Sequence, residues 1–157
     1  VTQMPDVLTA AVANVAEVVR EGYEGAEILG IHFEGPYLDM EYKGAQPPEA
    51  IAVPSVEQFQ MYQKAANGLI RYITLAPEHD PEFALTRYCK ETGVVVSMGH
   101  SSATYEQAMM GIANGATSMT HVFNGMTPFH HRKPGLVGQR YLRRGDLRWM
   151  PLPPCST

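Results

Sequence analysis

The sequence has no apolar run close to the roughly 20 residues that a helix needs to cross a bilayer, so it predicts no membrane span. Its first residues show no charged leader followed by an apolar block, and no secretion signal is expected. The chain begins with Val1 rather than methionine, which leaves a removed leader open. Cysteine is also scarce, because Cys89 and Cys155 are too few for a disulfide framework. Cytoplasm is therefore the expected compartment.

A strong excess of charge of either sign is missing too. The formal net charge of -4 gives no reason to expect a nucleic acid or an anionic membrane as partner. The hydrophobic fraction of 45% in 157 residues is enough for a packed core. These values indicate one modest globular domain, or part of a larger one.

The periodicity of the apolar residues predicts alternating helices and strands. A helix is expected from about Asp6 to Arg20, and further helices begin at capping residues Ser55, Asp80 and Thr104. Short apolar runs predict strands at residues 26–33, 70–75, 94–96 and 116–120. The order is one helix, then strand and helix three times, then a fourth strand, which indicates an α/β fold with a parallel sheet. Periodicity leaves open whether the sheet is an open one or half of an eight-stranded barrel.

Three of the predicted strands end next to a residue that can bind a metal ion. Glu34 follows the first strand, His100 the third and His121 the fourth. The carboxyl ends of parallel strands meet at one edge, where α/β proteins keep their chemistry. One Glu with two His is a recurring catalytic zinc shell that leaves a position open for water. The alternatives are capped or surface histidines and a salt-bridging or helix-capping glutamate. Four other histidines are expected to pack in the fold or lie on its surface: His32 by packing, and His79, His130 and His131 in surface loops.

An ordered series of motifs carries a resemblance to a known family, from the first helix to about Gly138. The motifs are Ile31-His32-Phe33-Glu34-Gly35-Pro36-Tyr37-Leu38, Lys43-Gly44-Ala45-Gln46, Thr74-Leu75-Ala76-Pro77-Glu78, Ser97-Met98-Gly99-His100-Ser101, Thr120-His121-Val122-Phe123-Asn124-Gly125-Met126 and Arg132-Lys133-Pro134-Gly135. Together they resemble the N-acetylglucosamine-6-phosphate deacetylases of the amidohydrolase superfamily, which are metal-dependent (βα)-barrel hydrolases. The resemblance implies a partial (βα)8 TIM barrel of about four parallel βα units at residues 1–146. Residues 147–157 are proline-rich, and we expect them to be a tail outside the family that arises from truncation or a frameshift.

The resemblance also implies roles for individual residues. Glu34, His100 and His121 become the ligands of a divalent metal ion, with zinc expected first and iron, manganese or cobalt as alternatives. The substrate-binding residues become Gln46 at the sugar, Asn124 and the Gly125 N–H at the sugar phosphate, and Arg132 at the phosphate. Arg132 next to Lys133 is alternatively a solvated basic surface, and Asn124-Gly125 is also a common turn pair.

The implied activity is hydrolysis of the acetamide of N-acetylglucosamine 6-phosphate to glucosamine 6-phosphate and acetate, in amino-sugar catabolism. The implied partner is this small amino-sugar phosphate, with no nucleic acid and no membrane, and the whole enzyme is expected to be a homo-oligomer. Two features depart from the family: no His-x-His pair precedes Glu34, and the family's acid–base aspartate is expected beyond Thr157. The chain alone is therefore expected to be inactive, with an apolar patch exposed where missing strands would pack. The alternatives are a non-catalytic fragment that retains only a metal or phosphate site, and an amidohydrolase for another amide.

Overall fold

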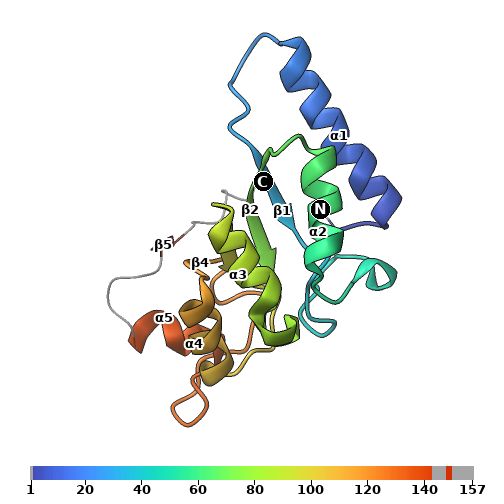
Figure 1. The fold of residues 1–157 in the computed structure, drawn as a ribbon. Coiled ribbons are helices and arrows are strands. Elements are labelled where there is room, and N and C mark those ends of the chain that lie inside the picture. Colours follow the sequence, from blue (N-terminus) through green and yellow to red (C-terminus); the bar gives the residue numbers. More distant parts are fainter. Residues whose placement is uncertain (1, 143–147, 150–157) are drawn as a thin grey trace, which may run out of the picture.

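The computed structural model describes residues 2–142 and 148–149. Their strands form one parallel sheet with the strand order β1-β2-β3-β4-β5. The predicted α/β class is confirmed, since helices alternate with the strands along the chain (Figure 1). The helices and strands are α1 (Pro5–Glu21), β1 (Ile31–Glu34), α2 (Val56–Ala65), β2 (Ile70–Leu75), α3 (Ala84–Glu91), β3 (Val95–Met98), α4 (Tyr105–Asn114), β4 (Ser118–Met119), α5 (Gly135–Leu142) and β5 (Arg148–Trp149). Short 3-10 helices lie at Pro48–Ala50, Pro77–His79 and Pro81–Phe83.

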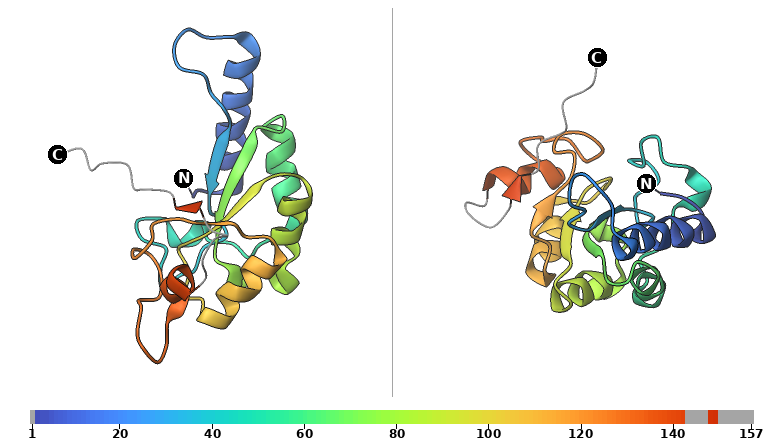
Figure 2. Two further views of the ribbon diagram at one scale, coloured as in Figure 1. Left: turned by 90° about the vertical axis from the view of Figure 1, so that its left-hand side faces the viewer. Right: turned by 90° about the horizontal axis from the view of Figure 1, so that it is seen from above.

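Helices α1 to α4 cover one face of the sheet side by side, as the view from above shows (Figure 2). The strand residues on this face are apolar and buried, among them Phe33, Ile73 and Val96. The Phe33 ring packs against Phe59 and Tyr62 of α2, at centroid distances of 6.3 and 5.1 Å. Burial of such aromatic and branched side chains is the main favourable term in folding. This layer fixes the direction of the strands and therefore the place of their carboxyl ends.

The opposite face of the sheet is largely polar. Alternate strand residues point to opposite faces, and hydroxyl and imidazole groups occupy the positions away from the helices. His32 Nε2 lies 2.7 Å from Thr74 Oγ1, which lies 2.8 Å from Thr120 Oγ1. Ser97 Oγ lies 2.7 Å from the same Thr120 hydroxyl. Hydroxyl groups thus occupy much of the face on which we expected an apolar patch, and Val95 on this face is 39% exposed. His32, which was expected to pack in the fold, is exposed, and its ring packs edge-on against Tyr72 at a centroid distance of 4.6 Å.

The first strand is shorter than its apolar run suggests. It begins at Ile31 rather than at residue 26, because pairing with β2 starts between Ile31 and Ile70. Leu29, just before it, is 80% exposed, and Gly30 has a positive φ of 155°. The apolar residues before Ile31 thus lie in a connection rather than in the sheet.

Helix α3 also begins later than predicted, although its capping residue was identified. Glu82 and Phe83 have φ values of 53° and 55°, which interrupts the helix between Pro81 and Ala84. The Asp80 carboxylate nevertheless accepts hydrogen bonds from the N–H groups of Leu85 and Thr86, at 3.1 and 2.8 Å. Asp80 therefore caps α3 as predicted, although it does not lie directly before the first residue of the helix.

Two elements near the end of the described chain were not predicted. Helix α5 packs against α4, and β5 pairs with β4 in parallel, with Arg148 opposite Ser118. β5 lies inside the segment that we expected to be a non-family tail. Residues 143–147 and 150–157 lie outside the described residues, so the boundary at residue 146 stays a prediction. No helix within the described ranges is both long and apolar enough to span a membrane.

Candidate metal centre

The ends of β1, β3 and β4 bring Glu34, His100 and His121 together. The Nε2 atoms of His100 and His121 lie 2.8 and 2.9 Å from the same oxygen, Oε1 of Glu34. The two imidazole rings are nearly perpendicular, with centroids 5.2 Å apart at an interplanar angle of 88°. One ligand atom from each residue lies within 4.8 Å of the others. The expected convergence at one sheet edge is thus observed, while the role of the three as metal ligands stays a prediction.

The local backbone explains how the two rings reach one point. His100 and His121 have φ values of 50° and 55°, so each strand turns sharply at its histidine in the left-handed region. Such a conformation in a residue other than glycine costs free energy and is concentrated at functional sites. Gly99 allows the strand ends to approach, because a Cβ at this position would lie 2.9 Å from the Thr120 carbonyl oxygen.

The charges of the group are coupled. Hydrogen bonding from His100, together with that from His121, lowers the pKa of Glu34 to about 2, although burial acts in the opposite direction. Burial by itself lowers the pKa of His100, but the hydrogen bonds to Glu34 and to the Tyr42 carbonyl outweigh it, and the pKa is raised. The carboxylate is therefore ionised over the whole physiological range.

The donor set of this group fits a divalent cation. His100 has an oxygen at each ring nitrogen, since Nδ1 lies 2.8 Å from the Tyr42 carbonyl and Nε2 faces Glu34. Both oxygens can only accept, so without a cation only the imidazolium satisfies both contacts. With a cation between Nε2 and Glu34, a neutral ring satisfies both, its Nδ1–H donating to the carbonyl as metal-binding histidines do. Imidazole with carboxylate suits zinc, iron, manganese and cobalt.

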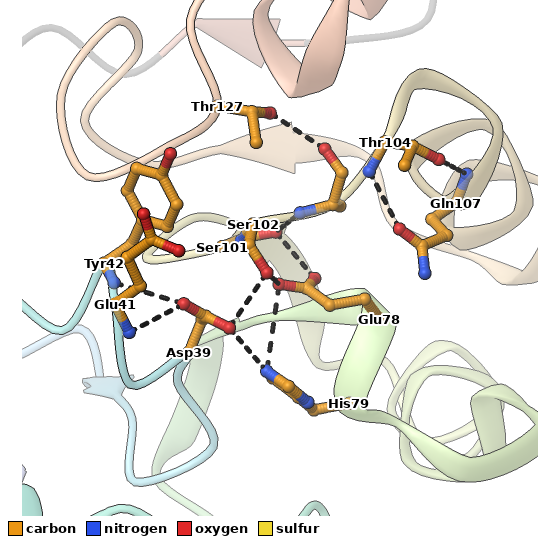
Figure 3. A network of polar contacts seen from close by, with 11 residues as sticks. Asp39, Glu41, Tyr42, Glu78, His79, Ser101, Ser102, Thr104, Gln107 and Thr127 are labelled. Carbon is orange, nitrogen blue, oxygen red and sulfur yellow. Dashed lines mark hydrogen bonds and ion pairs between the residues drawn. The ribbon is translucent and has the colours of Figure 1, made fainter.

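Figure 3 shows a second polar network, which is centred on Asp39. It adjoins the metal group, because the Asp39 N–H donates to the His100 carbonyl at 2.8 Å. Asp39 Oδ1 accepts hydrogen bonds from the N–H groups of Glu41 and Tyr42, at 2.9 and 3.2 Å. Asp39 Oδ2 lies 2.7 Å from His79 Nε2 and accepts a hydrogen bond of 2.9 Å from the Ser102 hydroxyl. Burial raises the pKa of Asp39, but these hydrogen bonds outweigh it and hold the pKa below its usual value.

Glu78 completes the network from the end of β2. Its carboxylate accepts from the Ser101 hydroxyl at 2.7 Å and from the Ser102 N–H at 2.6 Å. Asp39, Glu78 and His79 also have ligand atoms within 4.8 Å of one another, but hydrogen bonds from the surrounding loops already engage both carboxylates. His79 was predicted to lie in a surface loop, and its side chain is 44% exposed although it contacts Asp39.

The sequence reasoning gave no role to Asp39 or Glu78. Glu78 follows the 70–75 strand as Glu34 follows the first one, so the same strand-end rule would have found it. Asp39 has no comparable signal. It lies in a long loop, and its partner Ser102 is 63 residues away in the sequence.

The expected substrate-binding residues lie in two places. Gly125 adjoins the metal group, because a Cβ built on it would lie 3.5 Å from His100 Nδ1. Asn124 is exposed, and its backbone N–H donates to the His121 carbonyl at 2.6 Å. Gln46 accepts a hydrogen bond from the Thr2 N–H at 3.1 Å.

Arg132 lies in a separate cleft of about 520 Å³. Lys133 and His130 contribute further basic groups to the lining, Glu106 contributes one carboxylate, and Thr104 lines it at the start of α4. Ser102 belongs both to this lining and to the Asp39 network, so the cleft adjoins the strand-end loops. The structure therefore brings Gly125 to the candidate metal group and places Arg132 in a neighbouring basic cleft.

A parallel βα sheet with a candidate metal centre at its carboxyl edge is typical of the α/β proteins, both (βα) barrels and open sheets, which keep their active sites at that edge. No family model matches the chain. The crystal structure of N-acetyl-D-glucosamine-6-phosphate deacetylase from Mycobacterium smegmatis superposes with a TM-score of 0.86 at 34% identity, over 95% of this chain and 38% of that one. A mutant of that protein has been solved in complex with N-acetyl-D-glucosamine-6-phosphate.

Two curated relatives agree with the structural match. N-acetylglucosamine-6-phosphate deacetylase from Bacillus subtilis (strain 168) is 47% identical over 114 residues, which are 73% of this chain and 29% of the relative. N-acetylgalactosamine-6-phosphate deacetylase from Escherichia coli O157:H7 is 36% identical over 138 residues, or 88% of this chain and 37% of the relative. The chain is a homologue of the N-acetylglucosamine-6-phosphate deacetylases. It spans about a third of the length of the relatives that it matches.

Proposed function

We propose that the chain supplies the metal-binding segment of a divalent-metal-dependent deacetylase that acts on N-acetylglucosamine 6-phosphate. The observation that carries the proposal is the contact of both Nε2 atoms with one oxygen of Glu34 at the carboxyl edge of the sheet. Zinc is the expected ion, with iron, manganese or cobalt as alternatives, and amino-sugar catabolism in the cytoplasm is the expected setting. The assembly of the whole enzyme into a homo-oligomer stays a prediction.

The proposed reaction is hydrolysis of the acetamide. Water adds to the carbonyl carbon, the C–N bond breaks, and acetate and the free amine of glucosamine 6-phosphate are released. A divalent cation in the site supplies Lewis acidity toward the carbonyl and toward water. Glu34, His100 and His121 hold that cation as three protein ligands, and the contact between Nδ1 and the Tyr42 carbonyl orients the His100 ring.

Recognition of the sugar phosphate is proposed for the loops beside the metal group. Gly125 lies next to the His100 ring. Its backbone and the adjacent Asn124 can therefore contact a substrate whose acetamide lies at the cation. Gln46 is the proposed contact to the sugar. Arg132 offers a guanidinium in the basic cleft, and guanidinium and amide donors suit a phosphate dianion.

The experiment uses a chimaera, because the chain spans only about a third of its relatives. The corresponding segment of the Bacillus subtilis relative is replaced by residues 2–142 of this chain, and acetate release is measured. We expect metal-dependent release from N-acetylglucosamine 6-phosphate, and none when the chimaera carries Glu34→Gln. If the chimaera folds and binds metal but releases no acetate, the result would support the alternative that the chain is a non-catalytic fragment with only a metal or phosphate site.

The same chimaera separates the two hexosamine phosphates. The relative from Escherichia coli O157:H7 is named for the galactosamine epimer, so N-acetylgalactosamine 6-phosphate is the second substrate arm. Faster turnover of this epimer would reassign the sugar while keeping the reaction. Turnover of unphosphorylated amides alone would favour an amidohydrolase for another substrate.

A further inference from the structure

Asp39 is linked to His100 by two routes through the backbone. The Asp39 N–H donates to the His100 carbonyl at 2.8 Å. Asp39 Oδ1 accepts from the Tyr42 N–H at 3.2 Å, and the carbonyl of the same Tyr42 lies 2.8 Å from His100 Nδ1. The Asp39 side chain is 90% buried and does not belong to the candidate metal group.

The second route is a short turn that the Asp39 side chain closes by accepting hydrogen bonds from the backbone that follows it. An aspartate that accepts from N–H groups two and three residues later forms a local turn of this kind, which fixes the peptide groups inside it. Here the fixed groups are the N–H groups of Glu41 and Tyr42, whose hydrogen bonds to Asp39 Figure 3 shows. The Tyr42 carbonyl is thereby held toward the His100 ring. The other carboxylate oxygen, Oδ2, anchors the turn to the loops that follow β2 and β3, through His79 and Ser102.

The direction of the Tyr42 carbonyl decides where a neutral His100 ring carries its proton. A carbonyl oxygen can only accept, so the proton must lie on Nδ1 and the lone pair on Nε2, the atom that faces Glu34. A histidine binds a metal ion through the nitrogen that has the lone pair. If the carbonyl turned away, the ring would lose both its orientation and its preference for this tautomer.

We propose that Asp39 is a positioning residue, which holds the Tyr42 carbonyl so that His100 presents the Nε2 lone pair to a metal ion. The proposal rests on the proposed metal site and adds a residue to it that contacts neither the ion nor the substrate. The Oδ1 contacts carry this role, and the Oδ2 contacts with His79 and Ser102 only anchor the turn.

The test measures the affinity of the 157-residue chain for Zn²⁺ and Co²⁺ by calorimetric titration, in the wild type and in three variants of Asp39. Loss of a residue that orients a ligand typically weakens metal binding about 10- to 100-fold, and we expect this loss in Asp39→Ala. Asp39→Asn retains an acceptor for the Tyr42 N–H and should stay within about 3-fold of the wild type. Asp39→Ser, a weaker turn former, should lie between them. If Asp39→Ala does not fold, the metal affinities of the wild type, Asp39→Asn and Asp39→Ser still test the proposal. Equal affinities in these three proteins would overturn it.

Two further variants separate positioning from general loss of stability. Asp80→Ala removes another buried aspartate that accepts backbone N–H groups, so it should lower the melting temperature and leave metal affinity unchanged. His79→Ala removes only an Oδ2 partner and should bind metal within about 3-fold of the wild type. Equal losses in Asp39→Ala, Asp80→Ala and His79→Ala would overturn the proposal. A wild-type chain that binds neither ion would overturn the metal site itself, whereas a binding wild type with unimpaired Asp39 variants overturns only the role of Asp39.

Discussion

Both ring nitrogens of His100 face oxygen acceptors, and one of these belongs to a carboxylate whose pKa is about 2. This arrangement stabilises a positive charge between Glu34 and the Tyr42 carbonyl. In the metal-free chain the charge is a proton on the imidazole, and in the loaded chain it is the cation. The same three groups therefore give opposite pH dependences in the two states.

The first prediction concerns the metal-free chain. Glu34 has a lowered pKa, so its contribution to stability is present above its ordinary value of 4.5 and is lost as the pH falls toward about 2. His100 has a raised pKa, so its contribution is present below its ordinary value of 6.5 and is lost as the pH rises through the raised value. The contribution of this pair to the free energy of unfolding is thus largest between 4.5 and 6.5 and declines on the alkaline side.

With saturating Zn²⁺, the free energy of unfolding should rise rather than fall as the pH increases on the alkaline side. Metal binding displaces the proton from Nε2 of His100, so stabilisation by the metal grows as the pH rises. Urea unfolding with and without Zn²⁺, at about pH 5.5 and about pH 8.5, measures both slopes. His100→Gln is the control and should lose both effects. Equal slopes with and without metal would contradict the assigned charges.

The second prediction concerns Arg132 in the basic cleft. In the chimaera, Arg132→Ala should weaken discrimination for the 6-phosphate over the unphosphorylated sugar by about 1.5–3 kcal/mol, the range for hydrogen bonds to charged groups. Hydrolysis of the unphosphorylated amide should change far less. Lys133→Ala, the neighbouring cation in the same cleft, is the matched control and should have a smaller effect. Equal losses on both substrates would show that Arg132 does not bind phosphate.

Among the elements, the junction between β3 and β4 sets the distance between the two histidines. Gly99→Ala should destabilise the chain by about 1–3 kcal/mol, because its Cβ would lie 2.9 Å from the Thr120 carbonyl and would force the strand ends apart. Metal affinity should fall with it. Gly93→Ala has no atom within 4 Å of the new Cβ, so it should cost only the strain of its φ of 77°. Thermal unfolding and metal titration check both, and an unchanged metal affinity in Gly99→Ala would contradict the role of this junction.

The sequence predicts most elements because their signals are local. Thr104 and Gln107 form the capping box at the start of α4, and Asn114 ends the helix, as their order in the chain indicates. The start of α3 is different, because Glu82 and Phe83 adopt positive φ values that neither residue type favours. The start of β1 is set by where β2 offers partners, which no local pattern contains.

At the scale of the whole molecule, the candidate metal group joins parts of the chain that lie far apart in sequence. Glu34 contacts histidines 66 and 87 residues later. The strand-end rule predicts this meeting, since parallel strands bring their carboxyl ends to one edge. The Asp39 network could not be predicted in the same way, because it depends on how a long loop folds back over that edge. The polar residues on the sheet face opposite the helices were not predicted, because alternation along short strands does not indicate which face the helices cover.

A metal ion that binds these three residues should stabilise the whole chain, since it links the ends of β1, β3 and β4. At a free concentration of about 100 times Kd, the ion should raise the free energy of unfolding by about 2.7 kcal/mol. The decisive measurement is a Zn²⁺ titration of the 157-residue chain, followed by calorimetry and thermal unfolding, in the wild type and in Glu34→Gln, His100→Gln and His121→Gln. We predict one ion per wild-type chain with a higher melting temperature, and loss of both in each variant. Binding that persists in any of the three variants, or a wild type that binds no ion, would contradict the account.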